Sequence, residues 1–365
     1  MSTAAVVVDK ATNPASSTSD GIENKIYDLI IVGGGLSGLL IASRISQSKD
    51  KTFLLLEANN ILGGRLRNDG FGDDIDMGGA WIWPRSNPLM STLIKEEHLQ
   101  VMNQPGDKSC VRICGGVVML IHKLAEKIQA NNIRLNVAVQ SLMMMDSGDY
   151  IEIKSADGFV VKAKQVVITG PPKVISQNIL FSPPLCSRKQ IAMAASQTWM
   201  AGVTKVSLVY EIDGLSRDFT IGNMGLRNYD SESGCPAFQV YDACTENENI
   251  FALTFFVLAT GTDDDKSLAT QCGTQLREVV RGGTSIDFTN FSRFHVQRWP
   301  HEKYISEDRE PSDINPHPDP TKALAESDWD GSLVFAGTES DIRFPGMMEG
   351  AVGSAFRAVS FICNQ

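Results

Sequence analysis

Cysteine and histidine are scarce in this chain, and neither is arranged as a structural or metal-binding framework. The seven cysteines are scattered without a Cys-x-x-Cys pair, and the 365 residues include five histidines. An odd number of scattered cysteines favours reduced thiols over a disulfide framework, and this spacing predicts no metal site. We therefore expect an intracellular, cytoplasmic protein, with organelle targeting left open.

Positive charge and long apolar runs are also lacking. The formal net charge is −10, which argues against nucleic acid as a partner. No apolar run reaches the length of a membrane span, and the N-terminus lacks a charged segment followed by an apolar one. Residues 1–24, rich in Ala, Ser and Thr, are predicted to form a disordered tail. The remaining chain is long enough for two domains.

The most informative motif lies in residues 27–38. An apolar run at 29–32 predicts a buried parallel strand, and a helix is expected at 39–45. Between them, Gly33 allows a tight turn, Gly35 lets backbone approach a pyrophosphate, and Gly38 lets the helix pack on the strand. The N-terminus of this helix offers N–H donors and a partial positive charge to phosphates, and Leu36 and Ser37, which lead into it, are expected to contact the cofactor.

A second strand, predicted at 52–56, ends at Glu57, followed by Ala58. Glu57 lies 19 positions beyond Gly38, where a carboxylate meets the ribose hydroxyls of a bound dinucleotide. Strand, glycines, helix, strand and acid in this order predict an α/β, Rossmann-like dinucleotide-binding unit. The glycine motif alone does not distinguish FAD from NAD.

Hydrophobic periodicity predicts the other elements. Helices are expected at 87–99, 116–130, 267–281 and 350–362, and a polar turn at 103–108. Strands are expected at 133–142, 150–155, 159–164, 165–169, 203–211, 237–241, 250–258, 291–299 and 332–336, with a hairpin turn at 157–158. This order predicts a discontinuous nucleotide-binding domain (25–85, 112–183 and 328–365) and an inserted, β-rich second domain (86–111 and 184–327).

Five blocks carry a further resemblance: 31–38, 55–67, 78–82, 166–184 and 335–357. The last contains Phe335-Ala-Gly-Thr-Glu339 and Gly346-Met-Met-Glu-Gly-Ala-Val352. In this order the blocks resemble the flavin-containing amine oxidase family, which includes monoamine and polyamine oxidases, over most of residues 27–365. The resemblance implies FAD rather than NAD and a small-molecule, amine-like substrate. It also implies hydride transfer from a substrate C–H to flavin N5, with reoxidation by oxygen.

The resemblance also implies roles for particular residues. Arg65, beside Gly64, would pair with pyrophosphate oxygens, a bidentate task suited to guanidinium; an ordinary surface arginine is the alternative. Backbone next to the ribityl chain and the flavin ring would come from Gly78, Gly79, Ala80 and Trp81. Further expected cofactor contacts are Val139 (adenine), Gly337 and Glu339 (ribityl and pyrophosphate), Met347 and Met348 (the N1/C2=O end of the flavin) and Trp299, for which core packing is the alternative.

Lys205 is the candidate catalytic residue. Strand alternation places it on the face shared by Val203, Ser207 and Val209, so its ammonium needs a partner or a water. The resemblance implies that this lysine holds a water near flavin N5 and assists reoxidation. A strand lysine that extends to solvent is the alternative.

The chain departs from the family pattern in two places. About fifteen residues join 99 to 115, where the family has a long helical part of the substrate domain. We therefore expect a reduced substrate domain and an open flavin face, or one covered by a protein partner or a second copy. Met347 replaces one of two flavin-flanking aromatic rings, and residues 310–325 offer neither the other ring nor a cysteine, so FAD is expected to be noncovalent.

Three functions remain open at this point. The leading one is FAD-dependent oxidation of an amine. The second is oxidation of a dihydronicotinamide or a lipophilic polyene, and the third is a non-catalytic FAD-binding subunit of a larger assembly. Contact surface for the third could come from 143–145 or from 250–258, with a buried strand as the alternative for both.

Overall fold

The chain folds into two compact units. The computed structural model describes residues 25–70, 72–145, 148–211, 221–230, 234–258, 263–280, 286–306 and 316–364, so the tail predicted at 1–24 lies outside the described residues. The first unit comprises Met1–Arg65, Leu120–Thr198 and Pro316–Gln365, and the second comprises Leu66–Met119 and Trp199–Asn315. No helix of the described ranges is long and apolar enough to cross a bilayer.

The first unit is built on an eight-stranded sheet. β1 (Ile26–Val32) pairs in parallel with β2 (Phe53–Leu56) and with β8 (Val160–Ile168), and β15 (Leu333–Phe335) also joins β8 in parallel. The other strands are β5 (Ile133–Arg134), β6 (Val139–Met144), β7 (Ile151–Ser155) and β9 (Leu180–Ser182), in the order β5-β2-β1-β8-β7-β6-β9. β7 runs antiparallel to β6 and β8, so the hairpin turn predicted at 157–158 is confirmed.

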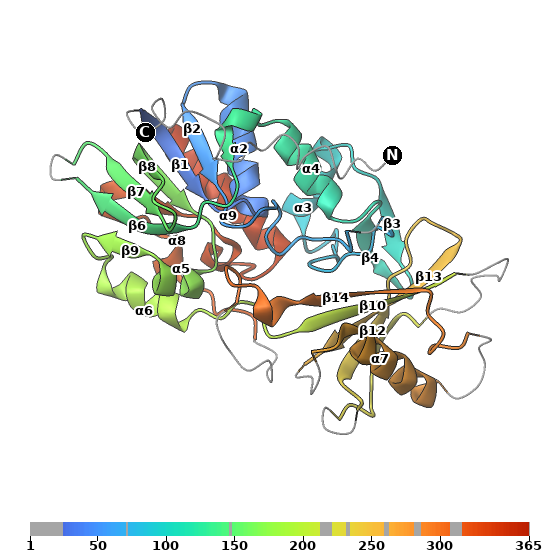
Figure 1. The fold of residues 1–365 in the computed structure, drawn as a ribbon. Coiled ribbons are helices and arrows are strands. Elements are labelled where there is room, and N and C mark those ends of the chain that lie inside the picture. The colour runs from blue at the N-terminus through green and yellow to red at the C-terminus, as the bar shows by residue number, and fades with distance from the viewer. Residues whose placement is uncertain are drawn as a thin grey trace. The chain divides into compact units, whose positions relative to one another are not determined.

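Helices of the first unit pack on this sheet and on each other (Figure 1). α2 (Leu36–Ser48) follows the glycine motif directly, and it contacts α9 (Met348–Cys363), the last helix of the chain. Shorter helices are α5 (Pro172–Asn178), α6 (Ser187–Ala195), α8 (Lys322–Ala325) and the 3₁₀ segments η3 (Ala130–Asn132), η5 (Trp329–Gly331) and η6 (Thr338–Ser340). α5 and α6 were not predicted, because the prolines around them indicated only a turn.

The second unit has a five-stranded antiparallel sheet, ordered β11 (Asn223–Gly225), β12 (Ala237–Asp242), β13 (Ile250–Val257), β10 (Thr204–Glu211) and β14 (Arg293–Arg298). One face of β10 packs with α7 (Asp265–Val279) through Leu208 and Leu276 (Figure 1). The opposite face carries Val203 and Val209 in a separate apolar cluster. The unit also contains α3 (Pro88–Glu96), β3 (Val101–Gln104), β4 (Asp107–Ile113) and η4 (Trp299–His301), and α4 (Val118–Glu126) begins in it.

Several local predictions are wrong in their bounds. The polar turn expected at 103–108 is the tip of a hairpin formed by β3 and β4, where Gly106 has φ +80. The strand expected at 133–142 is interrupted at Asn136, whose φ of 61 a strand cannot accommodate. The two strands expected at 159–164 and 165–169 are the single strand β8, Val160–Ile168, and the helix expected at 116–130 ends at Glu126.

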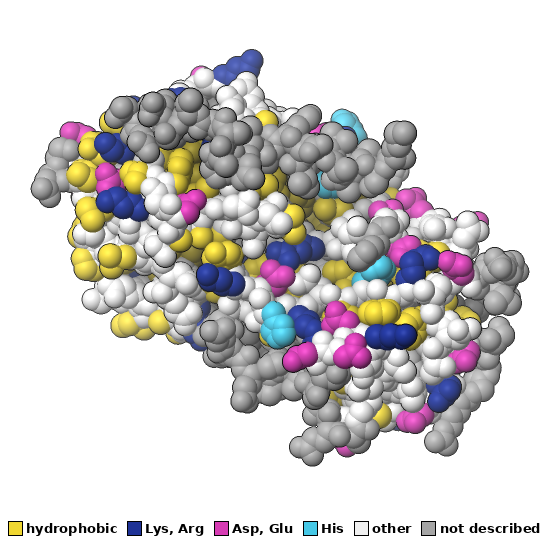
Figure 2. Space-filling model, viewed as in Figure 1, with side chains coloured by type: hydrophobic (Ala, Val, Ile, Leu, Met, Phe, Trp, Pro, Cys, Tyr) yellow, Lys and Arg dark blue, Asp and Glu magenta, His cyan; other side chains and the backbone are white. Residues whose placement is uncertain are grey.

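The surface carries mixed charge. On the face seen in Figure 2, Lys and Arg side chains are interspersed with Asp and Glu. Of the two segments considered as contact surface, β13 is buried along its whole length, whereas Met143 is 38% exposed. The buried-strand alternative is therefore confirmed for β13.

Candidate cofactor and active site

The glycine motif forms the turn from β1 into α2. Gly33 has φ +109, and a Cβ at Gly38 would lie 1.9 Å from the Gly33 carbonyl oxygen, so the fold itself requires both glycines. A Cβ at Gly35 would instead meet only Gly63 O, at 3.9 Å. Space beside Gly35 is thus open at the N-terminus of α2, where no described side chain caps the helix and no acid occupies its first turn. Such a helix end suits an anion.

A second glycine pair lies against the first. Gly63 N donates to Gly34 O at 2.9 Å, and Gly35 and Gly63 form an isolated parallel bridge. Gly64 has φ +59, and a Cβ there would lie 3.4 Å from Gly35 Cα. Two backbone segments without side chains therefore line the open space, which is the form of a cradle for phosphate groups.

Glu57 lies at the end of β2 with its carboxylate held by backbone donors. Its Oε2 accepts from Gly34 N at 2.6 Å, and its Oε1 accepts from Asn59 N at 2.8 Å. Its main chain pairs with Arg134 O and Val137 N, which brings the start of β6, including buried Val139, to the same end of the sheet. Ala58, half-buried, follows in the chain.

Arg65 and Glu339 form an ion pair that the sequence did not indicate. Arg65 Nη1 lies 2.8 Å from Glu339 Oε1, and the Glu339 side chain is fully buried. Neither Glu339 oxygen has a hydrogen bond of good geometry from any described residue, because the close Arg65 contact is poorly aligned. A fully buried carboxylate that is paired with one poorly aligned guanidinium keeps unused capacity for ligand hydroxyl groups.

The C-terminal motif completes the same end of the first unit. A Cβ at Gly337 would lie 2.9 Å from Thr169 O, so this loop packs closely on the end of β8. α9 begins at Met348 after Met347, whose carbonyl accepts from Thr338 Oγ1 at 2.6 Å. Ser37 Oγ donates to Ala336 O, so its side chain serves packing, and buried Leu36 also points into the fold.

Lys205 is buried in the second unit and makes three contacts with the protein. Its Nζ donates to Gly78 O at 2.6 Å and to Asp76 O at 3.4 Å, and it lies 3.1 Å from Tyr241 Oη. The ammonium also lies 5.4 Å from the ring centre of Tyr241 and 5.2 Å from that of Phe256. Of the two alternatives for this lysine, the structure therefore excludes extension to solvent.

Three aromatic rings pack on one another, and two of them, Tyr241 and Phe256, face the Lys205 ammonium. Trp81 meets Tyr241 edge-on with ring centres 4.6 Å apart, and Tyr241 and Phe256 are 5.4 Å apart. Trp81 Nε1 donates to Gln104 Oε1 at 3.0 Å. Periodicity alone does not indicate Tyr241 or Phe256, because both read as ordinary residues of buried strands.

Asp76 is a second buried charge beside this lysine. Its Oδ1 accepts from Val117 N at 2.7 Å. Burial raises the pKa of Asp76 to about 6, against the lowering influence of the Val117 hydrogen bond and of Arg112 and Lys205. The segment that follows Asp76 contains Gly78 and Gly79, both half-buried, and buried Ala80.

Trp299 is buried at the end of β14. Its Nε1 donates to Met77 O at 2.9 Å, and the Arg67 guanidinium lies 5.4 Å from its ring centre. Arg67 also pairs with Glu302 at 2.6 Å. Arg65 and Arg67 therefore have different surroundings, although both lie in one short motif.

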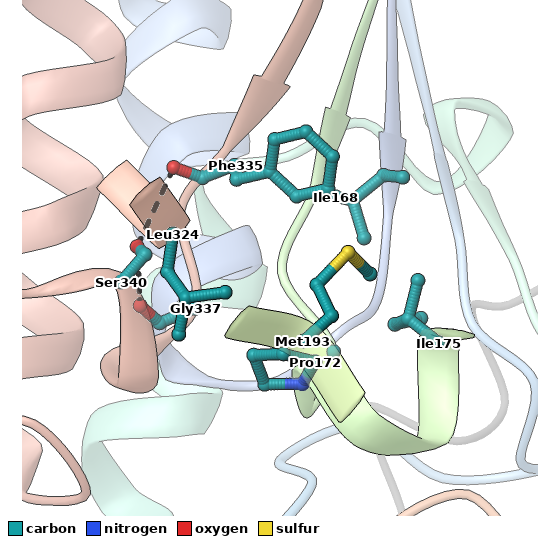
Figure 3. A pocket seen from close by; sticks show the side chains of 9 residues that line it. Ile168, Pro172, Ile175, Met193, Leu324, Phe335, Gly337 and Ser340 are labelled. Carbon is teal, nitrogen blue, oxygen red and sulfur yellow. Dashed lines mark hydrogen bonds between the residues drawn. The ribbon is translucent and has the colours of Figure 1, made fainter. Parts of the chain in front are cut away.

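A small apolar pocket in the first unit borders Gly337 (Figure 3). It encloses about 250 Å³, including space open to solvent, and its lining consists of Ile168, Gly170, Pro172, Ile175, Met193, Leu324, Phe335, Gly337 and Ser340. Ser340 Oγ, its one side-chain polar group, already donates to Gly337 O at 2.7 Å. The pocket thus offers packing space and no reactive group.

Comparison with known proteins identifies the family. Residues 102–363 match the family described as flavin containing amine oxidoreductase, and residues 31–96 match a NAD(P)-binding Rossmann-like domain. The chain belongs to the flavin containing amine oxidoreductase family. The predicted resemblance, the Rossmann-like fold class and FAD as the cofactor are confirmed.

The matches to individual relatives cover this chain to different extents. Human lysine-specific histone demethylase 2 is 27% identical over 254 residues, which is 68% of this chain and 29% of that protein. The dog protein named amine oxidase [flavin-containing] A is 35% identical over 79 residues, or 21% of this chain and 15% of the relative. The chain therefore matches less than a third of the length of either relative.

Solved structures of the family share the fold. Cyclohexylamine oxidase from Brevibacterium oxydans IH-35A superimposes with a TM-score of 0.73 at 15% identity, covering 93% of this chain and 99% of that one. Putrescine oxidase bound to putrescine gives a TM-score of 0.73 at 14% identity, covering 93% and 100%. At this level of identity the likeness describes the fold alone.

Proposed function

We propose that this chain is an FAD-dependent oxidoreductase of amine oxidase type, acting on a small-molecule amine. The observation that carries the proposal is the side-chain-free cradle at the N-terminus of α2, with the donor-poor carboxylate of Glu339 in the same unit. When bound, FAD supplies an N5 atom that accepts a hydride from a C–H next to the substrate nitrogen. The protein's task is then to bind, orient and keep out water.

The first unit supplies the binding groups in this proposal. Backbone N–H groups at Gly35, Leu36, Ser37 and Gly38, together with Gly33, Gly64 and Arg65, hold the pyrophosphate. Glu57, with Ala58 and Val139 beside it, receives the adenosine portion, and its two backbone hydrogen bonds keep the carboxylate oriented. Gly337, Glu339, Met347 and Met348 receive the ribityl and N1/C2=O portions.

The second unit supplies a preorganised positive charge. Lys205 holds the backbone at Gly78, and in this proposal Gly78, Gly79, Ala80, Trp81 and Trp299 form the protein side of the flavin ring. A fixed ammonium in a buried site stabilises negative charge that develops nearby, because little water is present to screen it. Lys205 would act this way on flavin that carries the substrate's electrons.

A second candidate is a dehydrogenase that passes electrons to an acceptor other than oxygen. The contacts of Lys205 favour it, since the carbonyls of Gly78 and Asp76 and the hydroxyl of Tyr241 already occupy three directions around Nζ. An ammonium has three N–H donors, so little capacity remains to hold a water. Family relatives include proteins named nicotine dehydrogenase and L-amino acid dehydrogenase.

Lys205→Met separates the two candidates. If the oxidase proposal holds, photoreduced FAD-loaded protein should reoxidise in air at least about ten-fold more slowly in the variant, because roughly 1.4 kcal/mol of charge stabilisation is lost. Lys189→Met is a matched control, since Lys189 is also buried and faces an aromatic ring, that of Phe335. Stopped-flow oxidation measures both; equal rates for Lys205→Met and wild type would exclude the oxidase role of Lys205 and favour the dehydrogenase.

The same proposal includes a protein surface that covers the open face of the flavin. Residues 99–115, where the family has helices, contain the hairpin of β3 and β4. We infer that a protein partner or a second copy covers the face. Light scattering of the FAD-loaded chain should report a dimer or larger species, and a strict monomer with full activity would contradict this inference.

A further inference from the structure

Three ionisable side chains of the second unit meet away from Lys205. Asp69 and Asp73 come from the loop between Arg67 and Met77, and His295 comes from β14. One donor atom from each lies within 4.8 Å of the others. His295 Nε2 is 3.1 Å from Asp73 Oδ2 and 3.5 Å from Asp69 Oδ2. The side chain of His295 is 5% exposed, that of Asp73 is 11% exposed and that of Asp69 is fully buried, so the cluster is nearly closed to solvent.

The loop that carries both aspartates is held by its own backbone. Asp69 N donates to Ile75 O at 3.0 Å, and Met77 N donates to Arg67 O at 2.9 Å. Asp73 N donates to Asp69 Oδ2 at 3.1 Å, which orients the Asp69 carboxylate toward the cluster. Its other oxygen, Oδ1, is buried and has no hydrogen-bond partner among the described residues. A buried carboxylate oxygen without a donor indicates a missing cationic or donor ligand.

The balance of charge around the cluster is negative. Asp69 and Asp73 place two carboxyl groups beside one imidazole. Arg293 donates to both oxygens of Asp73, from Nη2 to Oδ1 at 3.0 Å and from Nε to Oδ2 at 3.1 Å, and from Nη1 to Glu211 at 2.7 Å. Its side chain is 40% exposed, so it can remain on Glu211 if Asp73 takes another partner. One guanidinium therefore does not neutralise the negative charge of the cluster, whereas a divalent cation would neutralise it.

We propose that Asp69, Asp73 and His295 bind a divalent transition-metal ion of the Zn²⁺ or Mn²⁺ type. Ligands at about 2.0–2.1 Å in tetrahedral geometry lie roughly 3.3 Å apart, close to the two distances from His295 Nε2. An imidazole with two carboxylates suits these metals better than Ca²⁺ or Mg²⁺, which favour all-oxygen ligand sets. The ion would join the loop leading to Gly78 with the strand leading to Trp299, as a structural clamp within this unit.

Metal analysis of the full-length, FAD-loaded chain tests the site. After the thiols are blocked with iodoacetamide, equilibrium dialysis against Zn²⁺ and separately Mn²⁺ should yield one equivalent per chain by elemental mass spectrometry. Asp69→Asn and His295→Gln should each weaken binding at least ten-fold. Asp74→Asn, which removes a neighbouring charge but no ligand, is the matched control and should weaken it less. No stoichiometric binding, or equal effects of Asp69→Asn and Asp74→Asn, would overturn the proposal.

Arg293→Gln distinguishes a metal site from a closed ion-pair network. If the cluster binds metal, removal of Arg293 frees Asp73, so the affinity for Zn²⁺ or Mn²⁺ should rise several-fold and bound metal should raise the melting temperature. If Asp73, Asp69, His295 and Arg293 form only a closed polar network, the variant should melt lower and gain no metal affinity. That second result would overturn the proposal even if some binding is seen in wild type.

Discussion

Gly35 and Gly38 lie in one motif, yet substitutions there should have opposite consequences. Gly35 has φ −76 and ψ −174, an extended conformation open to any residue, and a Cβ would approach only Gly63 O at 3.9 Å. Gly35→Ala should therefore change the stability of the FAD-free protein by less than about 1 kcal/mol, since the one cost is a poorer helix cap. The added methyl group would occupy the open space beside the helix end.

At Gly38, unlike Gly35, the structure has no space for the added methyl group of Gly38→Ala. Its Cβ would lie 1.9 Å from Gly33 O and 3.1 Å from Thr169 Oγ1, where real contacts are longer. α2 would have to move away from β1, so the variant should lose roughly 1–3 kcal/mol or more of stability, as overpacked cores do. Any loss of FAD binding would then follow from damage to the fold.

Two measurements separate these effects. Urea unfolding of the FAD-free variants reports stability, and quenching of flavin fluorescence during titration reports the dissociation constant. We expect Gly35→Val to retain a folded FAD-free protein but to bind FAD at least about 100-fold more weakly, equivalent to about 2.7 kcal/mol. An unchanged dissociation constant for Gly35→Val would refute the phosphate cradle, and unchanged stability of Gly38→Ala would refute the packing argument.

Three further predictions concern the cofactor and a buried acid. Glu57→Gln should weaken FAD binding by about 1–3 kcal/mol, because a charged acceptor for ribose is lost; titration that gives the wild-type constant would remove Glu57 from the site. Acid precipitation should release all flavin into the supernatant, since the FAD is expected to be noncovalent, and flavin left in the pellet would contradict this. The pKa of Asp76 is raised to about 6, so the folded state binds this proton more tightly than the unfolded chain, and stability falls as pH rises from about 4 to about 6. Asp76→Asn should therefore be more stable than wild type at pH 7.5, by about 1–3 kcal/mol in urea, with the difference vanishing near pH 4; an equal difference at both pH values would contradict the assignment.

The domain division predicted from sequence and the prediction of no metal site also await experiment. Residues 112–119 belong to the nucleotide-binding domain in the predicted division and to the second compact unit of the structure. Metal analysis tests the second prediction. The prediction of no metal site was based on the spacing of cysteine and histidine along the chain. Asp69 and His295 are far apart in sequence, so no spacing rule could associate them.

Local preferences explain what the sequence determined by itself. The apolar run of β1, the glycine turn, the start of α2 and the acid at the end of β2 depend on backbone freedom and on short-range order, so they could be predicted from residues 27–57. The same holds for the face of β10 that carries Lys205, because strand alternation is a local rule. The family blocks then identified FAD, which the glycines could not.

Tertiary structure decided which distant groups meet. The pairing of Arg65 with Glu339, the three acceptors around Lys205 and the cluster at His295 each join segments far apart in the chain. The break at Asn136, between β5 and β6, likewise follows from main-chain hydrogen bonds to residues 57 and 59. Such contacts depend on how sheets and loops pack, and the free energy of burying a charge is set by the neighbours that packing provides. Periodicity in one segment contains no information about those neighbours.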